Sequence, residues 1–383
     1  MVTKSISPPA APTTFFVRRS LRVNFWRAPA SVRRYRVAVP SYGTITPTPD
    51  SAQLSHIARS PYRFETGYAL CPKRPSRPFP PPFVSLPSHS FSDPLTTHFQ
   101  SQDKRLSVRG ELVRGLTNGD DAVLVAENFI GVNDGVGAWA TKPQGHAALW
   151  SRLVLHFWAL EVERGVSDIA EPDTIGFLQR AYEETVEATT VPTEWLGTTT
   201  SVTALLHYSS EGGDPKPLLY VTNLGDCQVL VIRPSEKKIL FKTVEQWHWF
   251  DCPLQLGTNS SDRPNKDAVL SKVELEENDI VVAVSDGVID NLWEHELLAV
   301  ILESVEKWEA GQGGEATGDR TAGAGGGMVY VAREVLKAAH TVAQDPFAES
   351  PYMEKAVDEG LAMEGGKMDD ISVVLALCKK REV

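Results

Sequence analysis

Residues 131–140 read GVNDGVGAWA, in which a single carboxylate, that of Asp134, stands among small and apolar residues. The stretch follows an apolar run, AVLVAENFIGV at 122–132, that predicts a buried strand. One interpretation is a simple turn, because Asp-Gly is a common turn dipeptide. The other is that Gly135 and Gly137 allow the backbone to approach a ligand that Asp134 holds. The other acidic residues of the chain bear on this choice.

Aspartates occur in the same setting at three further places. NGDDAVLV at 118–125, VSDGVIDN at 284–291 and GGKMDDISVV at 365–374 each put aspartates in a turn beside an apolar strand. If these strand ends converge, four or more carboxylates meet in one cleft, where they repel one another unless a cation neutralises them. The aspartates concerned are Asp120, Asp121, Asp286, Asp290, Asp369 and Asp370.

Divalent ions are the physical solution to such a cluster. Oxygen ligands with no His or Cys nearby in the sequence favour Mg²⁺ or Mn²⁺ over Zn²⁺. Two such ions can lower the pKa of a shared water and stabilise both oxygens of an in-line displacement at phosphorus. The residue types therefore predict a hydrolase of phosphate esters that uses two Mg²⁺ or Mn²⁺ ions.

The charge is unevenly distributed along the chain. The formal net charge is −11, yet residues 1–92 carry 13 Lys/Arg and two acids, and the remainder carries 25 basic and 47 acidic residues. So acidic a globular part argues against nucleic acid and anionic lipid as partners, because both require a basic surface. The four cysteines lack CxxC spacing, which is typical of a reduced compartment. No run of about 18 apolar residues occurs, so no transmembrane segment is predicted.

The front of the chain differs in composition from the rest. Residues 1–49 contain Lys4 and seven arginines and no acid, and they fit an amphipathic helix. This composition predicts a mitochondrial targeting presequence over 1–40 and a matrix location, with a disordered basic tail as the alternative. Residues 41–100 are rich in proline, including PFPPPF at 78–83, and predict a linker without a helix or a central strand.

From about residue 101 the sequence alternates between strand and helix patterns, which defines a domain over 101–383. The stretch 218–233 predicts a hairpin around Leu224–Gly225–Asp226. Residues 310–327 form a glycine-rich insertion with nothing to bury, which is expected to be a mobile loop. Because no βαβ unit repeats, the pattern predicts an α+β layered fold. Strands are expected at 122–132, 199–208, 218–223, 227–233, 279–284 and 371–378, and helices at 145–165, 172–189, 294–308 and 328–343.

Six segments in order resemble the metal-dependent protein serine/threonine phosphatases, the protein phosphatase 2C family. They are GDDAV, GVNDGVGAW, LGTTTSVTALL, VTNLGDCQVLVIR, VSDGVIDNLW and GGKMDDISVVLAL, spread over roughly 105–380. With QWHWFDCPLQLG at 246–257, they look like the mitochondrial branch of the family. The resemblance implies a four-layer α-β-β-α sandwich, two antiparallel β-sheets packed face to face between pairs of helices. It also implies hydrolysis of phosphoserine and phosphothreonine in mitochondrial proteins.

The resemblance assigns the metal ligands. Asp134 would bridge two ions. The backbone carbonyl of Gly135 and the carboxylate of Asp120 would bind one of them, and Asp286 and Asp369 would bind the other. The activated water then attacks phosphorus in line without a phosphoenzyme intermediate.

Four further aspartates match supporting positions of the family. Asp121 and Asp370 match residues that orient metal-bound waters. Asp226 and Asp290 match positions that in some relatives help hold a third, weaker ion. A turn and a helix cap are the alternative roles of these two residues.

The chain departs from the family pattern in two respects. Val136 stands where many relatives have a histidine that protonates the leaving group. His146 and His248 are candidates to replace it, although a packing role is favoured for each. Arg114 is the nearest match to the arginine that binds the substrate phosphate shortly before the first acid.

Other functions were weighed against a phosphatase. An inactive family member acting as a regulatory scaffold is the main alternative, and the presence of the full acid set argues against it. A phosphohydrolase with an aspartyl-phosphate intermediate needs a second acid that NDGVG lacks, and no twelve-residue calcium loop occurs. Cys227 and Cys252 lack a phosphate-cradling loop and are expected to be core residues. The sequence specifies neither the particular phosphoprotein substrate nor the oligomeric state.

Overall fold

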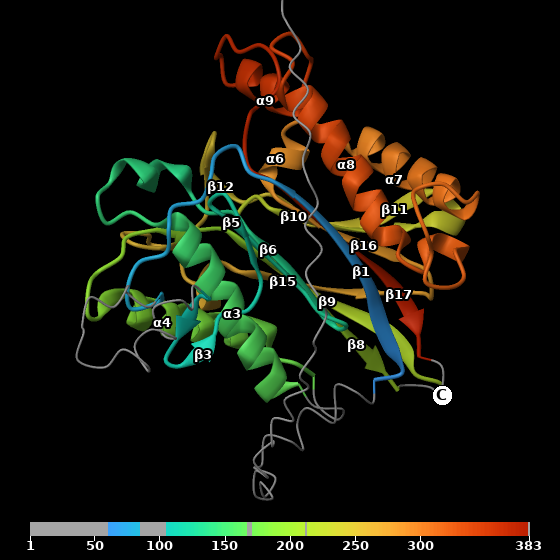
Figure 1. The fold of residues 1–383 in the computed structure, drawn as a ribbon, viewed down its shortest axis with the longest axis horizontal. Coiled ribbons are helices and arrows are strands. Elements are labelled where there is room, and N and C mark those ends of the chain that lie inside the picture. Colours follow the sequence, from blue (N-terminus) through green and yellow to red (C-terminus); the bar gives the residue numbers. More distant parts are fainter. Residues whose placement is uncertain (1–59, 85–104, 167–170, 211–212, 382–383) are drawn as a thin grey trace, which may run out of the picture. The chain divides into compact units, whose positions relative to one another are not determined.

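The computed structural model describes residues 60–84, 105–166, 171–210 and 213–381 (Figure 1). The expected presequence at 1–40, and residues 41–59 and 85–100 of the expected linker, lie outside these described residues. The described part contains two large antiparallel sheets and seven α-helices, which confirms the expected α+β class.

One sheet has five strands, in the order β1-β17-β16-β10-β11. All of β16 and the first eight residues of β17 are buried. Strands covered on both faces need apolar side chains on both faces, which explains why these two segments are almost continuously apolar. The strands are β1 Tyr62–Cys71, β17 Ile371–Lys380, β16 Ile280–Val284, β10 Gln228–Arg233 and β11 Lys238–Lys242.

The other sheet has six strands, in the order β15-β9-β8-β6-β5-β4. Its strands are β15 Val269–Glu274, β9 Lys216–Leu224, β8 Ser201–Ser209, β6 Phe129–Asn133, β5 Asp121–Val125 and β4 Leu116–Asn118. Shorter elements are β2 Ser107–Val108, β3 Glu111–Leu112, β7 Thr198–Thr199, β12 Trp247–Trp249, β13 Cys252–Pro253, β14 Leu256–Gly257, η1 Gly137–Thr141, η2 Pro234–Glu236, η3 Thr321–Gly323, α5 Pro264–Asp267, α6 Asp286–Ile289 and α9 Pro351–Asp358.

Three apolar clusters hold the sheets and helices together. One takes side chains from both sheets, such as Val132 of β6 and Val374 of β17. A second joins the six-stranded sheet to α3 (Ala147–Gly165) and α4 (Thr174–Thr190), and a third joins the five-stranded sheet to α7 (Glu294–Glu309) and α8 (Gly327–Ala343). Figure 1 shows these two helix pairs on opposite flanks of the sheets. No helix in the described ranges is both long and apolar enough to cross a membrane.

Two expected strand arrangements are wrong. Residues 122–132 form a hairpin of β5 and β6 rather than one strand, because the polar pair Glu127–Asn128 turns the chain. Strands β9 and β10 do not pair with each other, since Gly225, at a φ of 110°, redirects the chain and each strand joins a different sheet. Asp226 therefore lies where the chain crosses from one sheet to the other.

Strand β1 lies within the stretch expected to be a linker. It pairs with β17 over its whole length, from Tyr62 opposite Lys380 to Cys71 opposite Ile371. Pro61 and Pro72 flank the strand, so no proline interrupts its ladder of hydrogen bonds. The structure thus corrects the linker prediction for this segment.

The glycine-rich insertion at 310–327 packs against α7, contrary to the expectation that it has nothing to bury. The Arg320 guanidinium lies 4.1 Å from the centre of the Trp308 ring and donates to the Trp308 carbonyl at 2.9 Å. Trp308 Nε1 donates to the Ala324 carbonyl at 2.8 Å. A single large aromatic side chain thus organises the insertion.

Candidate active site

The strand ends that carry the aspartates converge at one end of the two sheets. β5 pairs with β6 and β16 pairs with β17, so each pair brings its own aspartates together. Two hydrogen bonds then join the sheets: Ser372 Oγ donates to Asp121 Oδ2 at 2.8 Å, and Asp120 N–H donates to Asp370 Oδ2 at 2.8 Å. The aspartates gathered at these ends are Asp120, Asp121, Asp134, Asp286, Asp369 and Asp370.

The backbone around Asp134 is held in place by Thr200, the residue between β7 and β8. The Asp134 N–H donates to Thr200 Oγ1 at 3.1 Å, and the Asp134 carbonyl accepts from the Thr200 N–H at 2.9 Å. A Cβ atom at Gly135 would lie 2.1 Å from the Asp120 carbonyl oxygen, so no side chain fits there. The glycine after Asp134 therefore allows the Asp120 and Asp134 segments to lie against each other.

Burial raises the pKa of several of these carboxyl groups. It raises the pKa of Asp121 and of Asp134 well above the ordinary value, and the neighbouring charge of Asp286 adds to both shifts. Burial also raises the pKa of Asp370 to about 6. Asp121 Oδ1 and Asp226 Oδ1 are buried without a hydrogen-bond partner in the described part of the chain. The cluster thus lacks sufficient positive charge to stabilise all of its carboxylates in the ionised form.

Two basic residues that follow β1 reach the outer edge of the cluster. Lys73 Nζ lies 2.6 Å from Asp369 Oδ1, and the Lys73 N–H donates to Asp370 Oδ1 at 2.7 Å. Arg74 Nη2 lies 2.6 Å from Asp120 Oδ2. Neither residue was predicted to belong to the site, because both lie in the stretch expected to be a linker. The alternation of aromatic and charged residues in YRFE at 62–65, the start of the strand before them, was the available signal.

A third basic residue, Lys367, lies at the inner edge of the cluster. Its Nζ is 2.9 Å from Asp286 Oδ2 and 2.8 Å from Asp290 Oδ2. Burial acts to raise the pKa of Asp286, but the Lys367 ammonium holds this pKa below its ordinary value. Burial raises the pKa of Asp290 to about 6 in spite of the same ammonium. Lys367 was also missed, although it stands within the quoted motif GGKMDDISVV.

Arg114 is not brought to this cluster. Its guanidinium pairs with Glu163 of α3, and its N–H donates to His156 Nδ1 at 3.2 Å. The contacts of Arg114 therefore do not support the prediction that it binds phosphate, because α3 offers it a carboxylate partner on the flank of the six-stranded sheet.

The two candidate histidines have structural partners. His146 Nδ1 accepts from the Leu149 N–H at 3.1 Å and so caps α3, and the His146 ring stacks on Phe79. His248 Nε2 lies 2.9 Å from Asp262 Oδ2. Cys227 is buried beside Thr200 Oγ1, as expected of a core residue, whereas Cys252 is partly exposed.

The donor set of the cluster fits hard divalent cations. Its carboxylates are crowded, partly unpaired and free of nitrogen and sulfur ligands, which is the chemistry that Mg²⁺ and Mn²⁺ prefer. No group of three or more His, Cys, Asp or Glu side chains within the described ranges is already arranged around one ion position. Lys73 and Arg74 instead pair with Asp369 and Asp120.

Comparison with known proteins identifies the family. No family model matches the chain. The protein phosphatase PTC7 homolog of Danio rerio is 30% identical over 282 residues, which cover 70% of this chain and 84% of the relative. The PTC7 homolog of Homo sapiens is also 30% identical, over 70% of this chain and 82% of its own length. The probable protein phosphatase 2C 1 of Oryza sativa subsp. japonica is 27% identical over 74% of this chain and 75% of the relative.

A solved structure shares the fold. The X-ray structure of the photosystem II phosphatase PBCP aligns with a TM-score of 0.55 and 24% identity, over 82% of this chain and 98% of that structure. The relatives above place the chain in the protein phosphatase 2C family, and the solved structure shows that the fold is shared. The chain is therefore an enzyme of the protein phosphatase class, and phosphorylated proteins are its substrates.

Proposed function

We propose that this chain hydrolyses phosphoserine and phosphothreonine in mitochondrial proteins with a water activated by two Mg²⁺ or Mn²⁺ ions, without a phosphoenzyme intermediate. The observation that supports this most strongly is the excess of buried carboxylates over fixed cations where the two sheets meet. When bound, the ions lower the pKa of a water and stabilise negative charge on the phosphoryl oxygens.

The proposed ion ligands are all carried by strand ends. Asp134 and the carbonyl of Gly135 extend from β6, and Asp120 lies beside them before β5. Asp286 and Asp369 extend from the paired strands β16 and β17. Each sheet thus contributes ligands. The stacking of the sheets sets the distance between the ligands of one sheet and those of the other.

Two more aspartates act by holding other groups. Asp370 accepts from the N–H groups of Asp120 and Lys73, at 2.8 and 2.7 Å, and so orients the segment that carries Asp120. Asp121 accepts from Ser372 Oγ, and its Oδ1 has no partner among the described residues, which suits it to orient a water beside the ions.

Arg74 is the proposed phosphate-binding residue in place of Arg114. Its guanidinium lies beside Asp120 at the edge of the cluster, and its side chain is 43% exposed. A planar guanidinium offers two parallel donors to phosphoryl oxygens, which suits it to orient a phosphate for in-line attack.

The catalytic domain, as proposed, is the four-layer α-β-β-α sandwich of the family. Its boundary lies before β1 rather than at residue 101, since β1 is part of the five-stranded sheet. Residues 1–40 are proposed to be a mitochondrial presequence on the strength of their composition. Import of the full chain into isolated mitochondria, with shortening of the product, would support this assignment, and a chain lacking residues 1–40 should remain outside.

The function is tested by phosphate release from a phosphothreonine peptide by the full chain, titrated with Mn²⁺ and Mg²⁺. Activity should require metal, vanish with a chelator and be lost in Asp286→Asn. The matched control is Asp251→Asn, because Asp251 also contacts Lys367, at 3.2 Å, but is half exposed. A folded wild-type chain that is inert with every metal would favour the regulatory scaffold.

A further inference from the structure

Lys367 is surrounded by acidic side chains at the inner edge of the cluster. Its Nζ contacts Asp286 Oδ2 at 2.9 Å, Asp290 Oδ2 at 2.8 Å and Asp251 Oδ1 at 3.2 Å. Its side chain is only 18% exposed. Asp226, whose Oδ1 has no hydrogen-bond partner in the described part of the chain, lies within electrostatic reach of the same group.

The backbone of Lys367 is locked to the turn that carries its partners. The Lys367 N–H donates to Asn291 Oδ1 and the Lys367 carbonyl accepts from Asn291 Nδ2, both at 2.9 Å. Asn291 is fully buried and also donates to the Gly287 carbonyl at 2.9 Å. Because Gly287 and Asn291 directly follow Asp286 and Asp290, the same side chain fixes the lysine and both carboxylates relative to one another.

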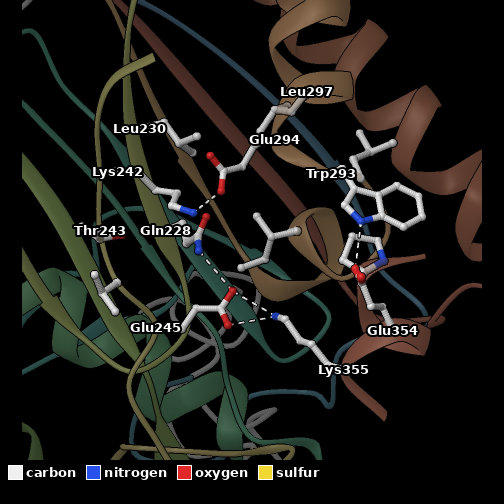
Figure 2. A pocket seen from close by; sticks show the side chains of 14 residues that line it. Gln228, Leu230, Lys242, Thr243, Glu245, Trp293, Glu294, Leu297, Glu354 and Lys355 are labelled. Carbon is white, nitrogen blue, oxygen red and sulfur yellow. Dashed lines mark hydrogen bonds and ion pairs between the residues drawn. The ribbon is translucent and has the colours of Figure 1, made fainter. Parts of the chain in front are cut away.

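Aromatic rings and a second lysine close this edge. Lys367 Nζ lies 4.7 Å from the centre of the Tyr352 ring, which itself lies 5.5 Å from the Phe250 ring. Lys355 Nζ lies 3.6 Å from Asp290 Oδ1 and is held by both oxygens of Glu245, at 3.0 and 2.9 Å. Figure 2 shows Lys355 and Glu245 in the wall of a neighbouring pocket of about 460 Å³.

A divalent ion and the Lys367 ammonium cannot share these ligands. An ion bound to Asp286 Oδ2 and Asp290 Oδ2 would lie about 2.0–2.2 Å from each oxygen, whereas the ammonium already lies within hydrogen-bond distance of both. The two positive charges would then be only a few ångströms apart in a partly buried site, where their repulsion is strong.

We infer that the Lys367 ammonium permanently fills the position in which Asp226, Asp286 and Asp290 would otherwise hold a third divalent ion, so that the chain binds two ions and not three. This inference rests on the proposed two-ion function. It makes Lys367 a positioning residue, which neutralises one edge of Asp286 and keeps that carboxylate in place for its own ion.

The test counts bound Mn²⁺ by equilibrium dialysis of the full chain and of its variants. Wild type should bind two ions and Lys367→Met three, since methionine is an unbranched side chain only one atom shorter and carries no charge. Lys367→Arg should bind two, as should the control Lys242→Met, which loses a lysine paired with Glu294 in the neighbouring pocket. Three ions in wild type, or two in a folded Lys367→Met, would overturn the inference and leave the phosphatase proposal intact. No bound Mn²⁺ in wild type would overturn both.

If Lys367→Met does not fold without metal, thermal unfolding in the presence of Mn²⁺ tests the inference instead. If an ion replaces the ammonium, Mn²⁺ should restore a cooperative thermal transition and raise the melting temperature of the variant more than that of wild type. Failure of Mn²⁺ to restore the fold, while Lys367→Arg folds normally, would show that the ammonium does not occupy an ion position, and would overturn the inference.

Discussion

The outer and inner edges of the carboxylate cluster are neutralised in different ways. At the outer edge, Lys73 and Arg74 reach Asp369 and Asp120 from an irregular segment, with side chains 27% and 43% exposed. At the inner edge, Lys367 is 18% exposed and is fixed through Asn291 to the turn that carries its partners. Exposed cations on long side chains can give way to ions or to a phosphate, whereas a locked and largely buried one is held in place. The cations at the outer edge can thus be displaced by ions or by a phosphate (the exchangeable edge), whereas Lys367 stays in place at the inner edge (the permanent edge).

The largest expected effect is on catalysis, at Asp286, the proposed ion ligand that pairs with Lys367 at the inner edge. Asp286→Asn should lower phosphate release from a phosphothreonine peptide roughly 10³-fold at saturating Mn²⁺, because a metal ion contributes several kcal/mol to stabilising charge in the transition state. Steady-state kinetics with Asp251→Asn as control would check this. Loss of less than about tenfold would show that Asp286 does not bind a catalytic ion.

The next expected effect is on stability at the permanent edge. Lys367→Met should lower the free energy of unfolding in chelator by about 3 kcal/mol, because removing one partner leaves buried carboxylates without a counter-charge. Denaturant titration with Lys242→Met as reference, expected to lose less than about 1 kcal/mol as a more exposed pair, measures the difference. Equal losses of unfolding free energy in Lys367→Met and Lys242→Met would contradict the proposed difference between the inner and outer edges.

We expect acid to destabilise the fold through a histidine remote from both edges. Burial, with the neighbouring charges of Arg114 and Arg152, lowers the pKa of His156 to about 4. The unfolded chain therefore binds more protons between pH 6.5 and about 4, so this contribution to stability is complete above pH 6.5 and is lost as the pH falls toward 4. The loss amounts to at most about 3 kcal/mol.

His156→Asn isolates this contribution, because the Asn Oδ1 atom can still accept the hydrogen bond that His156 Nδ1 accepts from Arg114. Unfolding free energies measured from pH 7 to 4 should fall less steeply in the variant than in wild type. Identical slopes would show that His156 is not the source of the loss of stability in acid.

The smallest expected effect is at the exchangeable edge. Arg74→Ala should raise KM for the phosphopeptide by about tenfold with little change in stability, because an exposed ion pair contributes at most about 1 kcal/mol to folding. Arg180→Ala, which removes an exposed arginine of α4 that pairs with Glu161 of α3, should leave KM unchanged. An unchanged KM in Arg74→Ala would exclude Arg74 as the phosphate-binding residue.

Local patterns predicted the helices well. The helices expected at 145–165 and 294–308 match α3 and α7 closely, since a regular apolar stripe must be buried along a helix. Asp120, Asp134, Asp286 and Asp369 were recognised because each stands in a turn beside a strand. The arrangement of strands was less predictable, because β9 and β10 look like a hairpin in sequence and only the stacking of two sheets separates them.

By itself, the sequence determined the chemistry of this protein: an all-oxygen set of carboxylates, carried by strand ends, in an acidic α+β domain. Only the tertiary structure decided which cations meet those carboxylates. Lys73 and Arg74 reach the cluster because β1 pairs with β17, about 300 residues away in the chain. Lys367 faces Asp286 and Asp290 because Asn291 ties two distant turns together. Charge pairing depends on distances between segments far apart in sequence, and those distances exist only once the sheets are stacked.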